Sequence, residues 1–275
     1  MKKLLILLLL LLSLGLIGSA YAEICDETST VQKRNGYLFL SNQTQLFSGE
    51  NICIYENGQY KVQGEYTNGL KDGKWTWWHE NGQKKEEGNY KDGKLDGKLT
   101  WWHENGQKYI EGNYKDFMKD GKWTWWHENG QKWAEGNYDL DYIEGKYTRW
   151  HEDGRQELES FYKKGDVFYK FLLKYYDNGQ IESKSKFMMS KTNGMNLNGK
   201  TTFWYRSGQK LGEGNYKEGK SDGMWTWWNN KGQRVENANF KDGDLLNKTI
   251  FKYSYFTGRL KSEKNYIDGK CISGC

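Results

Sequence analysis

Beyond its first twenty residues the chain has no long apolar run, and it contains no proline. Its mean hydropathy is −0.99, although aromatic residues make up 16% of the sequence. Long amphipathic helices need Leu and Ala at 3.6-residue spacing, and the rest of the chain lacks that pattern. Aromatic, charged and Gly residues instead alternate finely, which is typical of short strands and tight turns. We therefore predict a nearly all-β protein, with no transmembrane segment once the leader described below is removed.

The chain also lacks a strong excess of charge of either sign. It has 41 basic and 36 acidic residues, and removing a leader that contains Lys2 and Lys3 leaves 39 and 36, a net charge of +3. The two signs are interleaved, and no basic block suggests a nucleic-acid or membrane patch. We expect no nucleic-acid partner and a mixed, solvated surface.

Residues 1–22 have the three parts of a secretory signal peptide. Lys2 and Lys3 form the basic region, residues 4–17 form a 14-residue apolar region, and Ala20-Tyr21-Ala22 gives a small-x-small cleavage pattern. An uncleaved anchor is the alternative, but 14 apolar residues are short for a span of about 20. The leader predicts export to the periplasm, the cell surface or the medium, with Glu23 as the first mature residue.

Cysteine is scarce and confined to the two ends of the mature chain, at Cys25, Cys53, Cys271 and Cys275. In an oxidising compartment the simple interpretation is two disulfides, Cys25–Cys53 and Cys271–Cys275. The sequence alone allows three pairings. A metal site is the competing interpretation, but no His accompanies these thiols and the spacings do not match a zinc ribbon.

A repeat of 24 residues fills residues 49–270 in about nine units, between a cap segment at 23–48 and a tail at 271–275. The strictest marker is a turn glycine followed eight residues later by an aromatic residue. The turn glycines are Gly58, Gly82, Gly106, Gly130, Gly154, Gly179, Gly208, Gly232 and Gly258. The aromatic residues are Tyr66, Tyr90, Tyr114, Tyr138, Tyr162, Phe187, Tyr216, Phe240 and Tyr266. The marker persists across an insertion of five residues between Met188 and Asn198, whose role the sequence leaves open.

Each unit is predicted to be an antiparallel hairpin. Residues 75–78 (Trp-Thr-Trp-Trp) suit a pleated strand, and Asn81-Gly82 suits a two-residue turn with positive φ. The return strand ends near Tyr90, residues 91–93 (Lys-Asp-Gly) turn the chain into the next unit, and the glycines are spaced by turns. Stacked hairpins bury one another's aromatic rings. The fold we predict is an elongated, twisted, solenoid-like meander.

Alternation along the strand divides the tryptophans between two faces. Trp75 and Trp77 share one face, and Trp78 points to the other. Either the sheet folds over itself, or one face keeps an exposed aromatic row for a partner. The candidate partner-binding aromatics are Trp78, Trp102, Trp126, Trp150, Trp204 and Trp228.

The strings at residues 123–132 and 213–223 resemble the MORN-repeat variant family, which includes bacterial proteins labelled YwqK-type antitoxins. The resemblance covers roughly residues 49–270. It implies β-hairpin repeats with interaction or scaffold roles rather than a defined activity. The repeat is also loosely similar to choline- and glucan-binding cell-wall repeats, which makes glycan binding through exposed tryptophans the alternative function.

Every conspicuous polar residue is repeated rather than unique. All four histidines, His79, His103, His127 and His151, share one repeat position, and a glutamate follows each. Equivalent residues in successive hairpins lie about 9.6 Å apart at ~4.8 Å per strand. A zinc ion needs its ligands at about 2.0–2.1 Å, so the histidines cannot share one. Equivalent carboxylates also lack the distinct environments of a catalytic pair.

No nucleophile elbow or phosphate-binding glycine loop is present in the sequence. We therefore expect no catalytic residue, no cofactor and no metal. The function predicted is an exported, non-enzymatic repeat protein that presents an aromatic and charged surface to a protein partner. Carbohydrate binding is the alternative.

Overall fold

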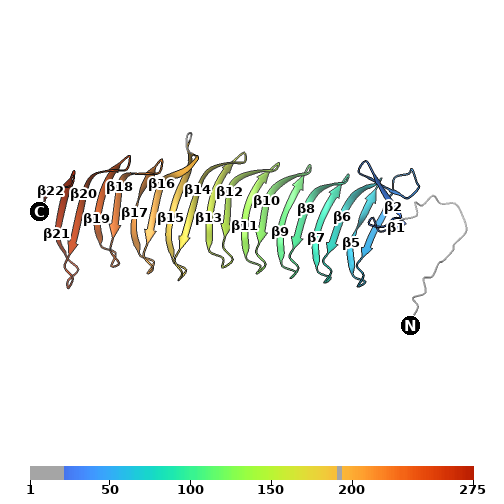
Figure 1. Cartoon of the computed structure of the whole chain (residues 1–275), viewed down its shortest axis with the longest axis horizontal. Helices are drawn as coiled ribbons and strands as arrows, with labels where there is room; N and C mark the ends of the chain where they lie inside the picture. The colour runs from blue at the N-terminus through green and yellow to red at the C-terminus, as the bar shows by residue number, and fades with distance from the viewer. Residues whose placement is uncertain (1–21, 191–193) are drawn as a thin grey trace, which may run out of the picture.

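The computed structural model describes residues 22–190 and 194–275, and these form strands and turns without a helix. The predicted signal peptide lies outside the described residues except for Ala22. No helix long and apolar enough to cross a membrane occurs in the described part of the chain. Figure 1 shows the strands side by side along one long axis, with the N-terminal segment at one end and the last strand at the other. The all-β prediction is confirmed.

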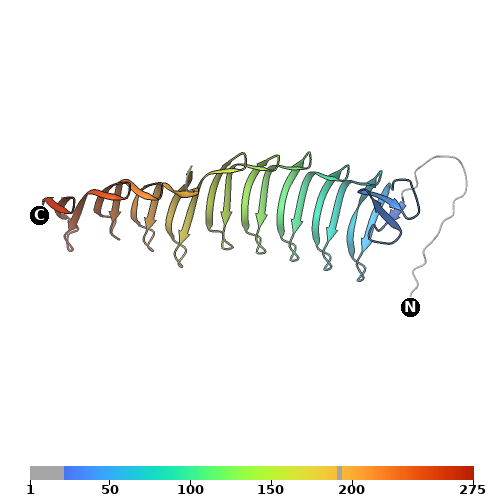
Figure 2. The same ribbon diagram turned by 45° about the horizontal axis from the view of Figure 1, so that its top comes forward.

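Strands β4 to β22 pair in sequence order, each antiparallel to the next. Strand β1 pairs with β4 in parallel, which makes one sheet of 20 strands, and β2 and β3 form a separate hairpin. The strands are β1 (Ala22–Ile24), β2 (Val31–Arg34), β3 (Tyr37–Leu40), β4 (Gly49–Ile54), β5 (Tyr60–Thr67), β6 (Leu70–Trp78), β7 (Lys84–Lys91), β8 (Lys94–Trp102), β9 (Lys108–Lys115), β10 (Met118–Trp126), β11 (Lys132–Asp139), β12 (Tyr142–Trp150), β13 (Gln156–Lys163), β14 (Asp166–Tyr175), β15 (Ile181–Ser190), β16 (Gly194–Trp204), β17 (Lys210–Lys217), β18 (Lys220–Trp228), β19 (Arg234–Lys241), β20 (Asp244–Tyr253), β21 (Leu260–Ile267) and β22 (Lys270–Ser273). The tandem hairpins are therefore as predicted, and Figure 2 shows them stacked along the length of the molecule.

The first turn of each unit differs from its prediction. In the unit after β6 the N–H of Gly82 donates to the carbonyl of His79 at 2.9 Å, and the N–H of His79 donates to the carbonyl of Gln83 at 2.8 Å. The loop therefore has three residues, and its last residue, Gly82, has a φ of 84°. The side-chain oxygen of Asn81 accepts a hydrogen bond from the N–H of Gln83 at 2.9 Å. The predicted two-residue turn was wrong, because Asn81 shapes the loop through its side chain and does not adopt positive φ.

The second turn is the two-residue one. Asp92 and Gly93, between β7 and β8, have φ values of 50° and 78°. Two consecutive residues with positive φ define the hairpin turn whose twist matches the strands on either side.

A third set of glycines lies inside strands, which corrects the prediction that the glycines mark turns alone. Gly121 in β10 has a φ of 70°, and the pairing of β9 with β10 shifts register between Asp120 and Thr124. The extra residues on β10 form a bulge, which bends the strand. Gly73 in β6 occupies the same place with a φ of 68°.

The bulge lets one face of a single sheet bury its tryptophans. Trp75 is 0% exposed and Trp123 is 2% exposed. The lysine just before each bulge lies over the rings, with the Nζ of Lys71 4.3 Å from the centroid of Trp75 and the Nζ of Lys119 4.6 Å from that of Trp123. The bent strands of this single sheet therefore curve around this face, which we call the aromatic face.

The return strand provides a glycine as the floor under each buried ring. A Cβ atom on Gly112 in β9 would lie 2.2 Å from the ring of Trp123, and one on Gly64 in β5 would lie 2.2 Å from Trp75. These glycines are needed for space. Gly121 has open space around its Cβ position and is needed for its positive φ.

The two glycine roles predict different costs within one repeat. Gly112→Ala drives a methyl group into Trp123 and is expected to lower the free energy of unfolding by about 2–3 kcal/mol. Gly121→Ala meets only the backbone penalty and is expected to cost about 1 kcal/mol. Urea denaturation of both variants measures the difference. Gly121→Asn, which tolerates positive φ, should be milder than Gly121→Ala, and equal losses at Gly112 and Gly121 would contradict the assignment.

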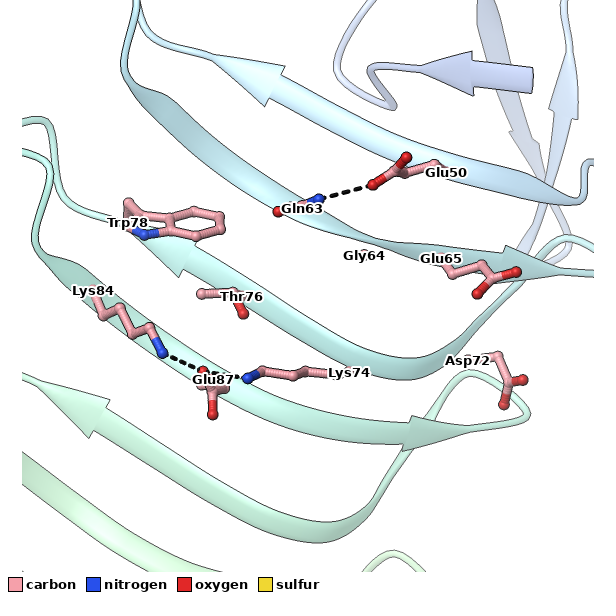
Figure 3. Close-up of a pocket in the computed structure, with 10 residues that line it drawn as sticks. All are labelled: Glu50, Gln63, Gly64, Glu65, Asp72, Lys74, Thr76, Trp78, Lys84 and Glu87. Atoms are coloured by element: carbon pink, nitrogen blue, oxygen red, sulfur yellow. Dashed lines mark hydrogen bonds and ion pairs between the residues drawn. The ribbon is translucent and has the colours of Figure 1, made fainter. Parts of the chain in front are cut away.

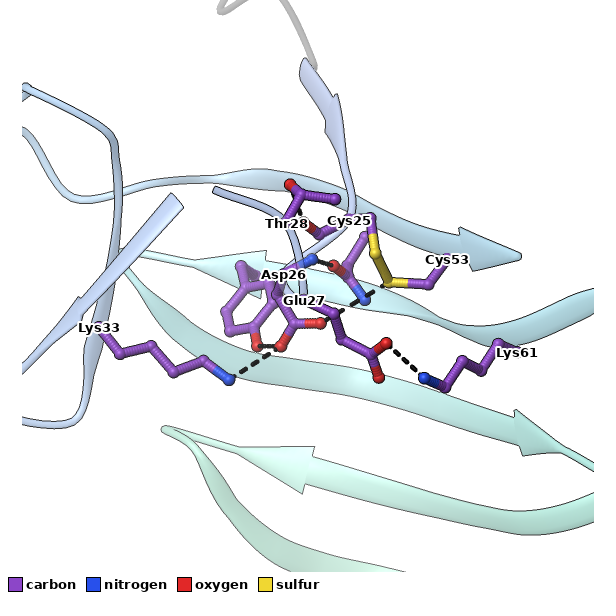
Figure 4. A network of polar contacts seen from close by, with 9 residues as sticks. Cys25, Asp26, Glu27, Thr28, Lys33, Cys53 and Lys61 are labelled. Atoms are coloured by element: carbon purple, nitrogen blue, oxygen red, sulfur yellow. Dashed lines mark hydrogen bonds and ion pairs between the residues drawn. A yellow bond between two sulfur atoms is a disulfide. The ribbon is translucent and has the colours of Figure 1, made fainter. Parts of the chain in front are cut away.

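An N-terminal cap covers the first edge of the array, and Figure 4 shows polar contacts and a disulfide that join it to the sheet. Leu38 and Phe47 pack against Val62 and Trp75 in a buried cluster. Parallel pairing of β1 with β4 occupies backbone groups that an edge strand would otherwise leave open. The cap thus protects the array from pairing at this end.

The carboxylate of Asp26 ties the cap to the sheet. It accepts hydrogen bonds from the Oη of Tyr66 at 2.8 Å and the Nζ of Lys33 at 3.0 Å. Burial raises the pKa of Asp26, but the hydrogen bonds from Tyr66 and Lys33 outweigh it and lower the pKa overall. Burial and the same carboxylate both raise the pKa of Tyr66. At neutral pH the carboxylate of Asp26 therefore stays ionised and accepts the hydrogen bond. The hydroxyl of Tyr66 stays neutral and donates it.

Candidate interaction surface

The face opposite the aromatic face carries a repeated ion-pair group. Lys74, Thr76 and Trp78 project there from β6, and Glu87 meets them from β7 (Figure 3). The Oε2 of Glu87 lies 3.0 Å from the Nζ of Lys74 and also contacts Lys84. Alternation along β6 explains the placement, because Lys74, Thr76 and Trp78 have the same parity. We call this surface the ion-pair face.

Four units share the complete arrangement of two lysines on one glutamate. The triads are Lys74–Glu87–Lys84, Lys98–Glu111–Lys108, Lys122–Glu135–Lys132 and Lys200–Glu213–Lys210. Two lysines and one glutamate leave each triad with a charge of +1. Three triads lie in consecutive units, so this positive charge recurs at every second strand, about 9.6 Å apart at ~4.8 Å per strand.

The triads hold their glutamates ionised. Burial raises the pKa of Glu111, but the hydrogen bonds and charges of Lys108 and Lys98 outweigh it and hold the pKa below its ordinary value of 4.5. The pKa of Glu213 is lowered first by the hydrogen bond from Lys200. Each glutamate is thus fixed as an acceptor, and the remaining donor capacity of its lysines faces solvent.

The lowered pKa of the triad glutamates predicts how the stability of the fold depends on pH. A carboxylate whose folded-state pKa is depressed stabilises the fold above its unfolded pKa, here near the ordinary 4.5, and this contribution is lost as the pH falls through the lower folded-state pKa. We expect a contribution of about 0.5 kcal/mol per triad because the groups are partly solvated. Guanidinium titrations of the wild type and of a quadruple variant with Gln at the four triad glutamates should differ at pH 7 and converge on acidification. A difference that grows below pH 4.5 would refute the sign.

The predicted partner-binding tryptophans lie partly buried, and most lie beside a lysine. The Nζ of Lys84 lies 5.7 Å from the ring centroid of Trp102, and the Nζ of Lys108 lies 5.6 Å from that of Trp126. Trp150 and Trp228 have the same contact with Lys132 and Lys210. Trp78 packs against Tyr60 instead, with ring centroids 5.6 Å apart, and Trp204 is also partly buried. The row therefore offers a lysine ammonium beside an indole rather than a bare aromatic platform.

The most exposed tryptophans of the described residues are others, Trp101 at 38% and Trp133 at 36%. Trp133 lines a hollow of about 490 Å³ near the first turns, together with Tyr109, His127 and Glu152. Sequence reasoning did not select Trp133 for binding. The available signal was that it alone among the tryptophans lies outside the first strand of a unit.

The repeated histidines connect neighbouring units. The Nε2 of His79 lies 3.2 Å from the carbonyl oxygen of Trp102, and His103 makes the same contact with Trp126 at 3.1 Å. Tyr205 occupies the equivalent place in a later unit and donates its hydroxyl to the carbonyl of Trp228 at 2.8 Å. A bridge from ring to carbonyl explains why the residue recurs.

Because Tyr205 replaces His at the equivalent position of a later unit, it predicts how His127 tolerates substitution. His127, whose Nε2 lies 3.1 Å from the carbonyl of Trp150, should accept Tyr with a loss below about 0.5 kcal/mol. His127→Ala leaves the carbonyl unpaired and should cost about 1 kcal/mol or more. Thermal unfolding of the two variants tests this, and equal losses would assign the ring a packing role only.

Four repeats of the chain match a known protein family. The profile of the MORN repeat variant matches four segments, residues 71–92, 95–116, 119–140 and 197–218. These four repeats are thus similar to the MORN repeat variant family. No curated relative matches the chain.

Two solved structures are similar over most of the chain. The "Crystal Structure of TcdB2-TccC3-Cdc42" shares 12% identity and covers 84% of this chain and 14% of that one, with a TM-score of 0.18. The "Crystal Structure of TcdB2-TccC3-TEV" shares 11% identity and covers 86% of this chain and 14% of that one, with a TM-score of 0.20. The chain thus spans only a small part of each solved chain. Scores this low support no conclusion about shared fold or function.

The MORN variant matches coincide with the triads. Each matched segment contains one complete lysine–glutamate–lysine group, from Lys74 in the first to Glu213 in the fourth. Units outside the matched segments keep the hairpin but lose part of the group, as in β12 and β13, where Lys146 pairs with Glu159 and Gln156 replaces the second lysine. The family motif and the ion-pair face are therefore one feature of the sequence.

The four cysteines are paired with each other. Cys25 is bonded to Cys53, and Cys271 is bonded to Cys275. Glu27 lies close to the first pair, so that three potential metal ligands fall within 4.8 Å. Because the two sulfurs are bonded to one another, they are not thiolate ligands here.

Proposed function

We propose that the protein is exported and non-enzymatic, and that it binds an extended protein partner through the ion-pair face. The observation that carries the proposal is the recurrence of the same net positive triad in four family-matched units, three of them consecutive. A partner with acidic side chains at a matching period would engage several triads at once. Weak single contacts then add up in one complex.

Binding, rather than catalysis, follows from the repetition. The conspicuous polar side chains stand in near-equivalent environments from unit to unit, whereas a catalytic pair needs two different ones. Export is supported by the three-part leader in residues 1–22. Fractionation of native cells tests it, and recovery of the full-length chain in the cytosol alone would overturn it.

The partner proposal is tested by crosslinking and pull-down of the mature chain. A variant with Gln at the second lysine of each triad (Lys84, Lys108, Lys132 and Lys210) removes the net charge and keeps the strands. A matched control places Gln at Lys91, Lys115, Lys163 and Lys217, which end return strands outside the triads. We expect the triad variant, and not the control, to lose the partner and the salt dependence of binding. Equal binding by both variants would overturn the proposal.

Carbohydrate binding is the second candidate, and the hollow at Trp133 favours it. An exposed indole and Tyr109 offer faces for a sugar ring, and Glu152 offers hydrogen-bond acceptors. Glycan-array binding that Trp133→Ala abolishes and the triad variant leaves intact would favour this candidate. Binding lost in Trp78→Ala or Trp102→Ala would instead place the glycan on the ion-pair face. Hydrolysis of a cell-wall substrate by the purified chain would overturn both.

A further inference from the structure

The aromatic face follows a rule of alternating size. Gly88 pairs with Trp75 on one side and with Leu99 on the other. Gly136 pairs with Trp123 and Tyr147 in the same way. Each small residue of a return strand is thus flanked by large ones, and the large side chains cover it.

The rule fails across β15, β16 and β17. Ser185 pairs with Thr201, and Thr201 pairs with Gly214, so three small residues lie next to one another. Thr201 takes the register position that Trp75 takes in β6, since each pairs with the glycine of the following return strand. A large side chain is therefore missing from this position of the aromatic face, which tryptophan, leucine or tyrosine fills in other units.

A hollow of about 230 Å³ lies where the large side chain is missing. Its apolar walls include Leu172, Phe187 and Phe203, while Lys174 and Ser183 contribute polar groups. Cavities of about 150 Å³ lined by apolar side chains accommodate benzene. This one has room for a ring or a branched chain with a short polar arm.

The hydroxyl of Thr201 is the second observation. Thr201 lines the hollow, is 1% exposed, and its Oγ1 has no hydrogen-bond partner among the described residues. A buried hydroxyl without a partner destabilises the fold, and valine would fill the same volume without that cost. An acceptor that reached this hydroxyl from the hollow would relieve the cost.

The charge of Lys174 indicates which class of ligand the hollow binds. Lys174 is exposed at the hollow and takes part in no ion pair within the described residues. Ser183 and Ser185 add hydroxyl donors on the neighbouring strand. We infer that this hollow binds a small carboxylic acid with an apolar body, whose carboxylate meets Lys174 and the hydroxyls and whose body packs against Leu172 and Phe203. The site lies on the aromatic face and is independent of the ion-pair face.

The test uses phenylacetate and 4-methylpentanoate as probes on the full mature chain, with phenylacetamide as the uncharged control. Ligand-observed NMR and calorimetry should show saturable binding of at least one acid. Thr201→Trp restores the repeat rule and fills the hollow, and should weaken binding by at least about tenfold. Lys174→Met should reduce the preference for acid over amide without abolishing amide binding. Absence of saturable binding by both acids, or equal binding to Thr201→Trp, would overturn the assignment.

Two further variants keep the result interpretable. Thr201→Val leaves the shape of the hollow and removes only the hydroxyl, so the unliganded variant should unfold at the same or a higher temperature while binding acid more weakly. A lower unfolding temperature would mean that the hydroxyl already has a partner, which contradicts the inference. Thr202→Val, one residue along β16 and of opposite parity, should leave acid binding unchanged.

The carboxylate could belong to a free acid or to the end of a peptide. Acetyl-glycyl-phenylalanine presents the same group at a chain end. Tighter binding of this dipeptide than of phenylacetate would identify a peptide terminus, and weaker binding would identify a free acid. Either result supports a carboxylate site. If neither compound binds, the inference is contradicted.

Discussion

Trp123→Ala is expected to lower the free energy of unfolding by about 3–5 kcal/mol, the range for removing a buried tryptophan. Trp123 is almost fully buried although it belongs to a single sheet. Its ring lies 5.3 Å from that of Tyr114 and 6.2 Å from that of Tyr138, and Gly112 forms its floor. The floor residue is a glycine and has no side chain that could fill the space. Guanidinium denaturation followed by far-ultraviolet circular dichroism measures the loss.

Trp133→Ala is the matched control, because the same residue type lies exposed on the following strand. It should cost less than about 1 kcal/mol. Repeat arrays unfold as coupled neighbours, so hydrogen exchange in Trp123→Ala should rise most in β9, β10 and β11. Similar losses for the two tryptophans, or uniform exchange along the array, would show that the aromatic face does not hold the repeats together.

The sequence contained enough information to find the repeat and its two faces. The aromatic residue eight positions after each turn glycine, such as Tyr90, belongs to the aromatic face and lies 6.4 Å from Trp75. Hairpin geometry fixes the separation of eight residues between the turn glycine and the aromatic residue. The marker therefore persists across insertions that break the 24-residue period. Parity alone placed Trp75 and Trp77 together, and their rings are stacked at 5.6 Å.

The sequence alone does not distinguish the two-residue turn from the three-residue loop. Four backbone positions between β6 and β8 have positive φ, and glycine occupies three of them, Gly73, Gly82 and Gly93, while Asp92 occupies the fourth. Asn81-Gly82 has the composition of a two-residue turn, but the hydrogen bond that the Asn81 side chain accepts from the N–H of Gln83 favours a three-residue loop. Which glycine forms a bulge depends on the pairing of the next strand, and local sequence does not encode it.

The ion-pair face was missed because its parts lie far apart in each repeat. Lys74 and Glu87 are thirteen positions apart and meet only across two paired strands. Repeated charges with mixed signs are typical of a solvated surface, and that is how they were interpreted. The constant recurrence of both lysines around the glutamate was the available signal. The hollow at Thr201 was likewise invisible, since its meaning depends on which residues lie beside it on neighbouring strands.

Loss of the Cys25–Cys53 bond is the other change with a large expected effect. The bond closes a separation of 28 residues, for which the chain-entropy estimate is about 3.5 kcal/mol. Cys25→Ser/Cys53→Ser should therefore lower the stability of the cap by about that amount, measured by denaturation and by proteolysis of the cap. Cys271→Ser/Cys275→Ser is the matched control, since a separation of 4 residues gives about 2 kcal/mol.

The consequence should extend beyond the cap itself. Cys53 lies in β4, the strand that β1 covers, and Cys25 directly follows β1. Without the bond the three-residue pairing of β1 with β4 has little to hold it, and release of the cap leaves the edge of β4 open. An open edge of a long sheet recruits other strands. The Cys25→Ser/Cys53→Ser variant should therefore self-associate in sedimentation experiments at concentrations where the control remains monodisperse, and a monodisperse cap variant would show that the packing of Leu38 and Phe47 suffices to keep the edge covered.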